Sequence, residues 1–219
     1  LNSPGGSVTG YGLAAAQLER LKAAGVTLTV CVDQVAASGG YMMACVADRL
    51  VAAPFAALGS VGVVTEVPNA YERLTREGVQ FNTITAGKYK RTLTPFKKTE
   101  EEDISKVTAE LEEVLSLFKR FAGQHRPALD IDAVATGEVW YGPDALKRGL
   151  CDELETADNV LLELYREGAE LFSITYRGPK SGVLERLLER QASGDASAAG
   201  VLGRLLRRML PDSGASWWR

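Results

Sequence analysis

One serine stands among small residues where a nucleophile would be accessible. Ser38 lies in the run AASGGY, residues 36–41, which joins an apolar β-rich stretch to an apolar helical stretch. The small neighbours let a ligand approach the backbone closely. A helix that begins here would direct its unpaired amides and its positive dipole end toward charge developing beside the Ser38 hydroxyl. The pattern fits a nucleophile, and it also fits a serine that only caps the helix.

A serine nucleophile needs a base. The chain has one histidine, His125, which stands beside Arg126 at the end of a charged helical stretch, where histidine is more often structural or solvated. The alternative is a lysine, which acts only in its neutral form and therefore requires desolvation or neighbouring positive charge. Lys90 has such neighbours in the run GKYKR, residues 87–91, although lysine-rich turns are usually solvated surface. The residues alone leave the base unassigned.

Length, net charge and cysteine content limit the kinds of protein that this chain resembles. The 219 residues, 46% of them hydrophobic and 24% charged, are enough to bury one core, and we expect one domain with a tail. A net charge of −3 gives no electrostatic reason to expect a nucleic acid as partner. The three cysteines stand at no metal-ligand spacing and are interpreted as free thiols, so we expect no metal and no cofactor.

Helices and strands alternate along the chain on both sides of Ser38. The apolar periodicity predicts helices over residues 8–24, 41–47, 67–78, 99–124, 143–148 and 157–168, and strands ending at residue 6 and over residues 28–32, 49–51, 59–64 and 81–85. Thr99 and Glu102 form a capping-box pattern at the start of the longest helix. This order is typical of an α/β fold with right-handed crossovers. Glycine-rich corners follow the first strands, so residues 5–6 and 38–39 are expected side by side at one sheet edge.

The C-terminal part changes character at about residue 178. Its leucine- and arginine-rich stretches carry more Lys and Arg than Asp and Glu. We therefore divide the chain into a domain at residues 1–177 and a basic Leu/Arg-rich tail at residues 178–219, helical or mobile, which suits a membrane surface or a partner. No apolar run is long enough to span a membrane. Because the chain begins abruptly within a strand and without a start Met, we expect an N-terminally truncated fragment.

Four short motifs occur in the order and spacing of a known family: LNSPGG at residues 1–6, AASGGY at 36–41, LGSVGV at 58–63 and AGKYK at 86–90. Together they resemble the signal peptide peptidase A family of membrane-associated Ser-Lys peptidases, over about residues 1–176. The chain looks most similar to the SohB branch of that family at residues 12–15, 40–48 and 89–94. The tail carries no motif of the family.

For catalysis, the resemblance implies Ser38 as the nucleophile and Lys90 as the general base. Lys90 matches the family lysine, and Lys88 does not, because the matching lysine is the third residue after Gly87. Ser60 matches the second serine of the family, whose hydroxyl orients the lysine amine. The resemblance implies no metal and no cofactor.

The resemblance also implies how a substrate is held. The Gly39 amide and an amide of the Gly5 and Gly6 turn would form an oxyanion hole, which agrees with two neighbouring corners. An extended peptide would pair by β-addition with strands near the nucleophile. The residues implied for this pairing are Ser3, Val61, Gly62 and Val63.

The implied fold is a crotonase- or Clp-protease-like layered α/β fold, with helices packed on small β-sheets, that assembles into rings. Because the chain holds one copy of each motif, we expect a homo-oligomer in which Ser38 and Lys90 meet across a subunit interface. The implied activity is that of a membrane-associated serine endopeptidase that hydrolyses remnant signal peptides or other short apolar or unfolded segments. We expect association with the inner membrane through an anchor in the missing N-terminal part and through the tail, with the domain on the periplasmic side.

Two other functions stay open. A crotonase-type acyl-CoA enzyme shares this fold and also holds an oxyanion with two amides, but it needs acidic groups near that site. The acid nearest to Ser38 in the sequence, Asp33, is interpreted as a turn residue. A catalytically inactive homologue would instead act as a ring scaffold or as the partner of a membrane protein.

Overall fold

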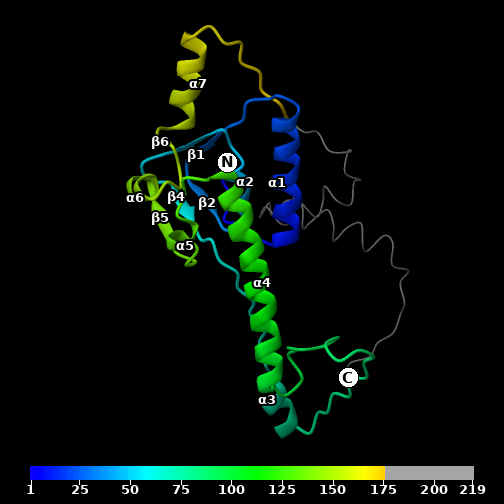
Figure 1. The fold of residues 1–219 in the computed structure, drawn as a ribbon. Helices are drawn as coiled ribbons and strands as arrows, with labels where there is room; N and C mark the ends of the chain where they lie inside the picture. Colours follow the sequence, from blue (N-terminus) through cyan, green and yellow to red (C-terminus); the bar gives the residue numbers. More distant parts are fainter. Residues whose placement is uncertain (176–219) are drawn as a thin grey trace, which may run out of the picture. The chain divides into compact units, whose positions relative to one another are not determined.

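The computed structural model describes residues 1–175, and residues Leu1–Glu170 form one compact unit (Figure 1). The predicted tail at residues 178–219 and its boundary lie outside the described residues and stay predictions. The helices in the described part are α1 (Val8–Ala23), α2 (Gly39–Ala44), α3 (Tyr71–Arg76), α4 (Glu101–His125), α5 (Ile131–Val134), α6 (Gly142–Lys147) and α7 (Ala157–Arg166). The strands are β1 (Thr29–Val32), β2 (Val35–Ala37), β3 (Arg49–Ala52), β4 (Ala57–Gly59), β5 (Val139–Tyr141) and β6 (Glu153–Leu154).

The described strands form two small sheets. β1, β3 and β6 make a parallel sheet in the order β1-β3-β6, and β2, β4 and β5 make a second sheet in the order β2-β4-β5. In the second sheet β2 and β4 are parallel, whereas β4 and β5 are antiparallel. The predicted mixed α/β architecture with helices and small sheets is therefore confirmed, while the crotonase- or Clp-like arrangement and the assembly into rings stay predictions.

The core is built around α2. This helix has the sequence GGYMMA, contains no charged residue, and packs against α1, β2 and α4. Its apolar side chains are buried because it is surrounded by other elements rather than by water. Tyr41 is fully buried and donates a hydrogen bond from its hydroxyl to the Leu150 carbonyl at 3.2 Å, and burial raises the pKa of its phenol. A rigid, buried α2 fixes the position of the corner that precedes it.

The long helix α4 extends from the core to a second region, which contains Lys97 and α3. In its C-terminal half Phe118 and Ala122 are buried and belong to the core. At its N-terminal end Asp103 accepts a hydrogen bond from Lys97 at 2.6 Å, and α3 lies beside this end (Figure 1). No helix within residues 1–175 combines the length and the apolar character needed to cross a membrane.

Two predicted strands are wrong. The strand predicted over residues 59–64 instead ends at Gly59, where φ is +112° and the backbone leaves the sheet. The segment predicted as a strand over residues 81–85 is exposed and irregular, and Phe81 stacks on Phe96 with ring centroids 4.4 Å apart. Strand propensity is effective only where a partner strand is available, and none of the described strands pairs with this segment.

Two helix starts also differ from the prediction. α3 is shorter than the predicted helix over residues 67–78. α4 begins with Glu100 as its N-cap, and the Glu100 amide donates to the Asp103 carboxylate at 3.0 Å. The capping box is therefore formed by Glu100 and Asp103 rather than by Thr99 and Glu102, because the Glu102 carboxylate pairs with Lys88.

Asp152 connects three parts of the core. Its carboxylate accepts hydrogen bonds from the Leu50 amide at 2.6 Å and from the Arg126 guanidinium at 2.7 Å. Burial opposes ionisation of Asp152, but these bonds outweigh it and hold the pKa of the carboxyl below its ordinary value. Arg126 ends α4 with a side chain that is only 12% exposed, so loss of the Asp152 charge would leave a largely buried cation without its partner.

We expect Asp152→Asn to lower the free energy of unfolding by about 1–2 kcal/mol at neutral pH. The effect is smaller than for a fully buried pair because the Asp152 side chain is 39% exposed. Folding lowers the pKa of the Asp152 carboxyl. The stabilisation by the Asp152 charge is therefore present above the unfolded-state pKa of about 3.9 and is lost as the pH falls through the folded-state pKa. Urea unfolding near neutral pH and in acid measures this, with the exposed Asp158→Asn as control. Equal losses at both pH values would contradict the ion-pair explanation.

Candidate active site

Ser38 occupies a strained corner between β2 and α2. Its φ of 53° and ψ of −121° lie in a region that side chains rarely adopt, and such conformations cost about 1–3 kcal/mol and cluster at functional sites. Ser38 and Ser60 are the only non-glycine residues with positive φ in the described part of the chain. The Ser38 side chain makes no capping hydrogen bond to α2. The capping interpretation therefore does not explain this serine, and its hydroxyl is available for other chemistry.

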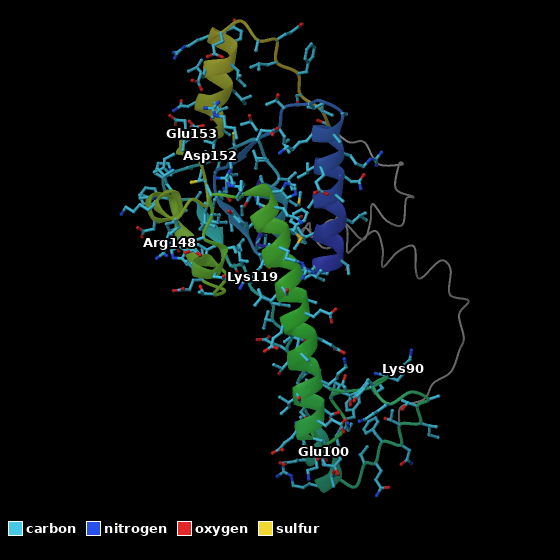
Figure 2. The ribbon with its side chains drawn as sticks, in the orientation of Figure 1. Lys90, Glu100, Lys119, Arg148, Asp152 and Glu153 are labelled. Carbon is cyan, nitrogen blue, oxygen red and sulfur yellow. The ribbon has the colours of Figure 1, made fainter. Side chains whose placement is uncertain are left out.

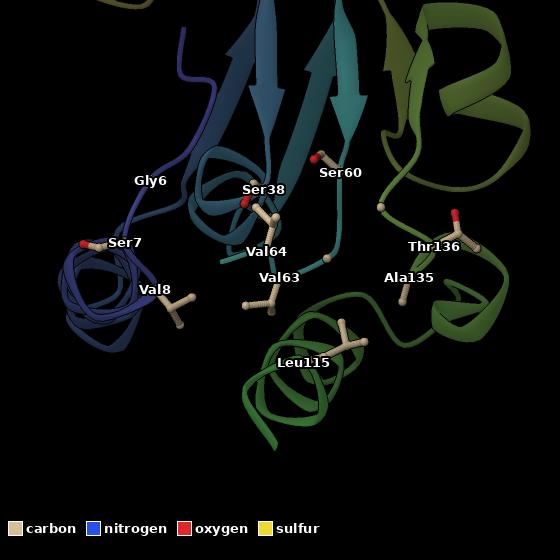
Figure 3. A pocket seen from close by; sticks show the side chains of 12 residues that line it. Gly6, Ser7, Val8, Ser38, Ser60, Val63, Val64, Leu115, Ala135 and Thr136 are labelled. Carbon is tan, nitrogen blue, oxygen red and sulfur yellow. The ribbon is translucent and has the colours of Figure 1, made fainter. Parts of the chain in front are cut away.

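The sheet register brings Ser38 and Ser60 together. In the parallel pair of β2 and β4, Ala37 lies opposite Gly59, so the two serines are the next residues on neighbouring strands. The Ser38 amide donates to the Gly59 carbonyl at 2.8 Å, and the Ser60 amide donates to the Glu138 carbonyl at 2.6 Å. These bonds hold both backbones at the same edge, and Figure 3 shows the two side chains in one pocket.

The pocket has a volume of about 480 Å³. Two of the four sequence motifs supply further lining residues, Gly6 from the first and Gly62 and Val63 from the third. Its other walls include apolar side chains from α1, α4 and the segment before β5, namely Val8, Leu115 and Ala135, with Val64 and Thr136 nearby (Figure 3). The described lining contains no Asp or Glu. A pocket whose described lining holds apolar and hydroxyl side chains without a charged group suits an uncharged substrate segment.

The two glycine corners lie against each other, as the sequence predicts. A side chain at Gly5, which has a φ of +92°, would lie 2.7 Å from both the Ala37 carbonyl oxygen and the Ser38 Cβ. A side chain at Gly40 would collide with the Ser3 carbonyl oxygen. Only glycine at these positions allows the backbones to approach this closely.

Two backbone amides at the corners make no hydrogen bond within the described part of the chain. Within residues 1–175, neither the Gly6 amide nor the Gly39 amide has a protein acceptor. The Gly5 amide differs, because it donates to the Ser3 Oγ at 3.3 Å. Gly6 lines the pocket, and Gly39 directly follows Ser38. Of the predicted oxyanion donors, the geometry thus favours Gly39 and Gly6 over Gly5.

The predicted substrate strand is only partly open. The Ser3 amide donates to the Val35 carbonyl at 2.8 Å and the Ser3 carbonyl accepts from the Ala37 amide at 3.0 Å, so its main chain is already paired. Val61 is buried, and its carbonyl accepts from the Gly137 amide at 3.1 Å. These contacts leave Ser3 no main-chain group for β-addition. Gly62 and Val63 line the pocket and remain candidates.

Lys90 is not brought to Ser38 within the chain. Lys90 is exposed, and Figure 2 shows it near the start of α4. Its neighbour Lys88 pairs with Glu102 at the same end of this helix. The pocket meets α4 at Leu115, thirteen residues beyond Glu102 in the numbering. At 1.5 Å per residue this separation is about 20 Å along the helix. The hydrogen bond with Glu102 raises the pKa of Lys88 to about 12, which disfavours Lys88 as a neutral base.

The remaining candidates have structural partners. His125 lies 2.8 Å from the Glu19 carboxylate and packs on Phe121, and it does not line the Ser38 pocket. Asp33 accepts a hydrogen bond from the Ala157 amide at the start of α7 at 2.9 Å, which agrees with its interpretation as a turn residue. Within residues 1–175 no group of three or more His, Cys, Asp or Glu side chains is arranged to hold a metal ion.

The sequence analysis missed Tyr11, Leu115 and the segment around Thr136. Leu115 and Thr136 line the pocket, whereas Tyr11 lies beneath its glycine corners. Leu115 is one of three leucines on an amphipathic helix, and the segment around Thr136 is distant from every motif. No local pattern distinguishes these residues, because only the packing of α1, α4 and β5 places them at the site.

Comparisons with known proteins identify a family and several relatives of this chain. The sequence model of a family described as "Peptidase family S49" matches residues 20–171. A probable protease SohB of Haemophilus influenzae is 48% identical over 204 residues, which are 93% of this chain and 56% of that protein. A probable protease SohB of Buchnera aphidicola is 49% identical over 167 residues, covering 76% of this chain and 50% of that protein. A putative protease of Methanocaldococcus jannaschii is 34% identical over 167 residues, covering 75% of this chain and 53% of that protein. The chain spans about half the length of these curated relatives.

Proposed function

The chain belongs to peptidase family S49, within its SohB branch, and from this premise we propose that it is a serine endopeptidase with Ser38 as its nucleophile. One observation carries the proposal. Ser38 stands in a strained corner, free of any capping bond, and lines a pocket together with Gly6, while the Gly6 and Gly39 amides have no acceptor within residues 1–175. A nucleophile with preorganised donors for an oxyanion is the arrangement that acyl transfer requires.

The proposed reaction is acyl transfer through an ester intermediate. A neutral Lys90 amine takes the proton of the Ser38 hydroxyl, and the Ser38 oxygen attacks the carbonyl carbon of the substrate. The Gly39 and Gly6 amides hold the negative charge that forms on the carbonyl oxygen. The ammonium then gives its proton to the leaving amine, and the peptide bond breaks. Water, deprotonated by the amine, hydrolyses the ester and regenerates Ser38.

We propose that Lys90 comes from a second copy of the chain. The separation of about 20 Å along α4 keeps Lys90 of the same chain away from the Ser38 pocket, and no lysine lines that pocket within residues 1–175. The segment that carries Lys90 is exposed, as are the large apolar side chains of Phe81 and Ile84 in it. A homo-oligomer in which this segment reaches a neighbouring pocket would complete the site, with Ser60 orienting the amine.

The proposed substrates are short, apolar, extended peptide segments such as remnant signal peptides. The pocket of about 480 Å³ is lined by apolar or small residues, among them Val63, Leu115 and Gly62, and by no described acid. A charged side chain would lose its hydration there without a partner. Action at the inner membrane, with the domain on the periplasmic side, is part of this proposal because it suits such substrates.

Labelling with a fluorophosphonate tests the proposed nucleophile. We expect the probe to label the wild-type chain on Ser38, to label Ser116→Ala equally, and to leave Ser38→Ala unlabelled; Ser116 is an exposed serine on α4. Mass spectrometry of the digested protein identifies the labelled residue. Turnover of a CoA thioester without labelling would favour the crotonase-type enzyme. An unlabelled wild-type chain without either activity would favour the inactive scaffold.

A further inference from the structure

Tyr11 lies between the two glycine corners. Tyr11 is the fourth residue of α1, and its ring packs under the backbone at both Gly39 and Gly6. A Cβ at Gly39 would lie 2.7 Å from the ring carbon Cδ2, and a Cβ at Gly6 would lie 2.9 Å from the adjacent ring carbon Cε2. One edge of a single aromatic ring therefore contacts the residues whose amides are available to a ligand.

The opposite end of the Tyr11 side chain is fixed. Its hydroxyl forms a hydrogen bond of 2.7 Å with the Ser3 Oγ, in which either oxygen is able to donate. Ser3 is held in register with β2 by its two main-chain bonds, to Val35 and to Ala37. An aromatic ring has few rotatable bonds, so a ring anchored at its hydroxyl is a stiff spacer.

The Ser3 hydroxyl of this pair also engages one amide of the Gly5 and Gly6 turn. The Ser3 Oγ accepts from the Gly5 amide at 3.3 Å, which directs that amide toward Ser3. The next amide, that of Gly6, belongs to a residue that lines the pocket. Loss of the anchor would free the Gly5 and Gly6 turn to rotate, because glycine restricts the backbone least.

We propose that Tyr11, anchored by Ser3, is a positioning residue that sets the separation and direction of the Gly6 and Gly39 amides. This inference rests on the proposed function and adds to it a residue outside the four motifs. Tyr11 contacts neither the nucleophile nor the pocket in this role. It acts through the two glycines, and its effect should appear only where an oxyanion forms.

A pair of inhibitors separates this role from general structural damage. The Ser38 oxygen attacks the carbonyl carbon of a peptide aldehyde while its proton passes to the Lys90 amine, so the C=O π bond opens and the carbonyl oxygen becomes an oxyanion. The matching peptide alcohol binds without forming one. For Tyr11→Leu in the full chain we expect kcat to fall by about 30-fold with KM within about twofold, and aldehyde inhibition to weaken by a similar factor. Alcohol binding should stay unchanged. Tyr11→Phe and Ser3→Ala each remove one hydroxyl of the hydrogen bond that anchors Tyr11. For each variant we expect kcat and aldehyde affinity to fall about threefold to tenfold, with KM and alcohol binding unchanged.

Tyr165→Phe is the control, because Tyr165 is an exposed tyrosine of α7 that does not line the Ser38 pocket. It should leave kcat and the ratio of aldehyde to alcohol affinity at the wild-type values. Equal changes in aldehyde and alcohol binding for the Tyr11 variants, or wild-type kcat in all of them, would overturn the positioning role. Loss of the near-ultraviolet circular dichroism signal in Tyr11→Leu would mean that its tertiary packing is lost. In that case the kcat and inhibitor affinities of Tyr11→Phe and Ser3→Ala decide whether Tyr11 positions the amides. A wild-type chain that binds no aldehyde would overturn the proposed function itself.

Discussion

Ser38→Ala is expected to lower kcat for casein or a short apolar peptide ester by at least about 10⁴-fold, since removal of a covalent nucleophile abolishes the acyl-enzyme route. The variant should fold normally. Ser38 makes no side-chain capping bond, and its main-chain bonds to Gly59 and Met42 do not involve the hydroxyl. Alanine at a φ of 53° carries the same kind of strain as serine, so little stability should be lost.

Ser116→Ala is the control for this experiment. Ser116 is an exposed serine of α4 whose hydroxyl accepts only from Arg120 in the described structure, at 3.2 Å. It should retain the wild-type kcat. Activity of Ser38→Ala within about tenfold of wild type would reject Ser38 as the nucleophile, since so small a loss is typical of a positioning group.

Lys90→Ala is expected to be as inactive as Ser38→Ala, because without a base the hydroxyl keeps its proton. Lys88→Ala is a close control, since it removes a lysine from the same basic run. Lys88 is bound to Glu102, and that bond raises its pKa to about 12, so it is a poor candidate for the base. Loss of activity in Lys88→Ala together with wild-type activity in Lys90→Ala would reverse the assignment. Wild-type activity in both would return attention to His125.

Mixing the two inactive variants tests whether the site is shared between copies. In a random mixed oligomer, half of the subunits keep Ser38 and half of their neighbours supply Lys90, so about a quarter of the wild-type activity should return. No activity should return if each chain uses its own lysine, because every chain then lacks one of the two groups. A stable monomer with full activity would contradict the shared site as well.

The sequence was informative about elements that are set by local patterns. The helices α1, α6 and α7 lie close to the ranges that their periodicity and caps predict, and β1 and β3 lie in the expected apolar runs. A helix of small and apolar residues after Ser38 was also predicted, because a segment with no charged residue is stable only inside a core. These features depend on residues that are near one another in the chain.

The predictions failed where a segment depends on a distant partner. The run at residues 81–85 has the composition of a strand but no strand beside it in the described structure, and β4 ends at Gly59, where the positive φ interrupts the extended backbone. The capping box moved by one residue because Lys88 engages Glu102. Local propensity does not contain this information, since it does not specify which side chains approach from elsewhere.

The amino-acid sequence alone identifies the groups that are proposed for catalysis: a serine among small residues, glycines at two strand ends, a second serine, and a basic run with Lys90. Tertiary structure decided how they combine. The parallel register of Ala37 with Gly59 puts Ser38 beside Ser60, and the Ser3 main chain pairs with β2. Residue types fix which reactions are available, whereas hydrogen-bond register and packing fix which groups meet, because both join residues that the chain order keeps apart.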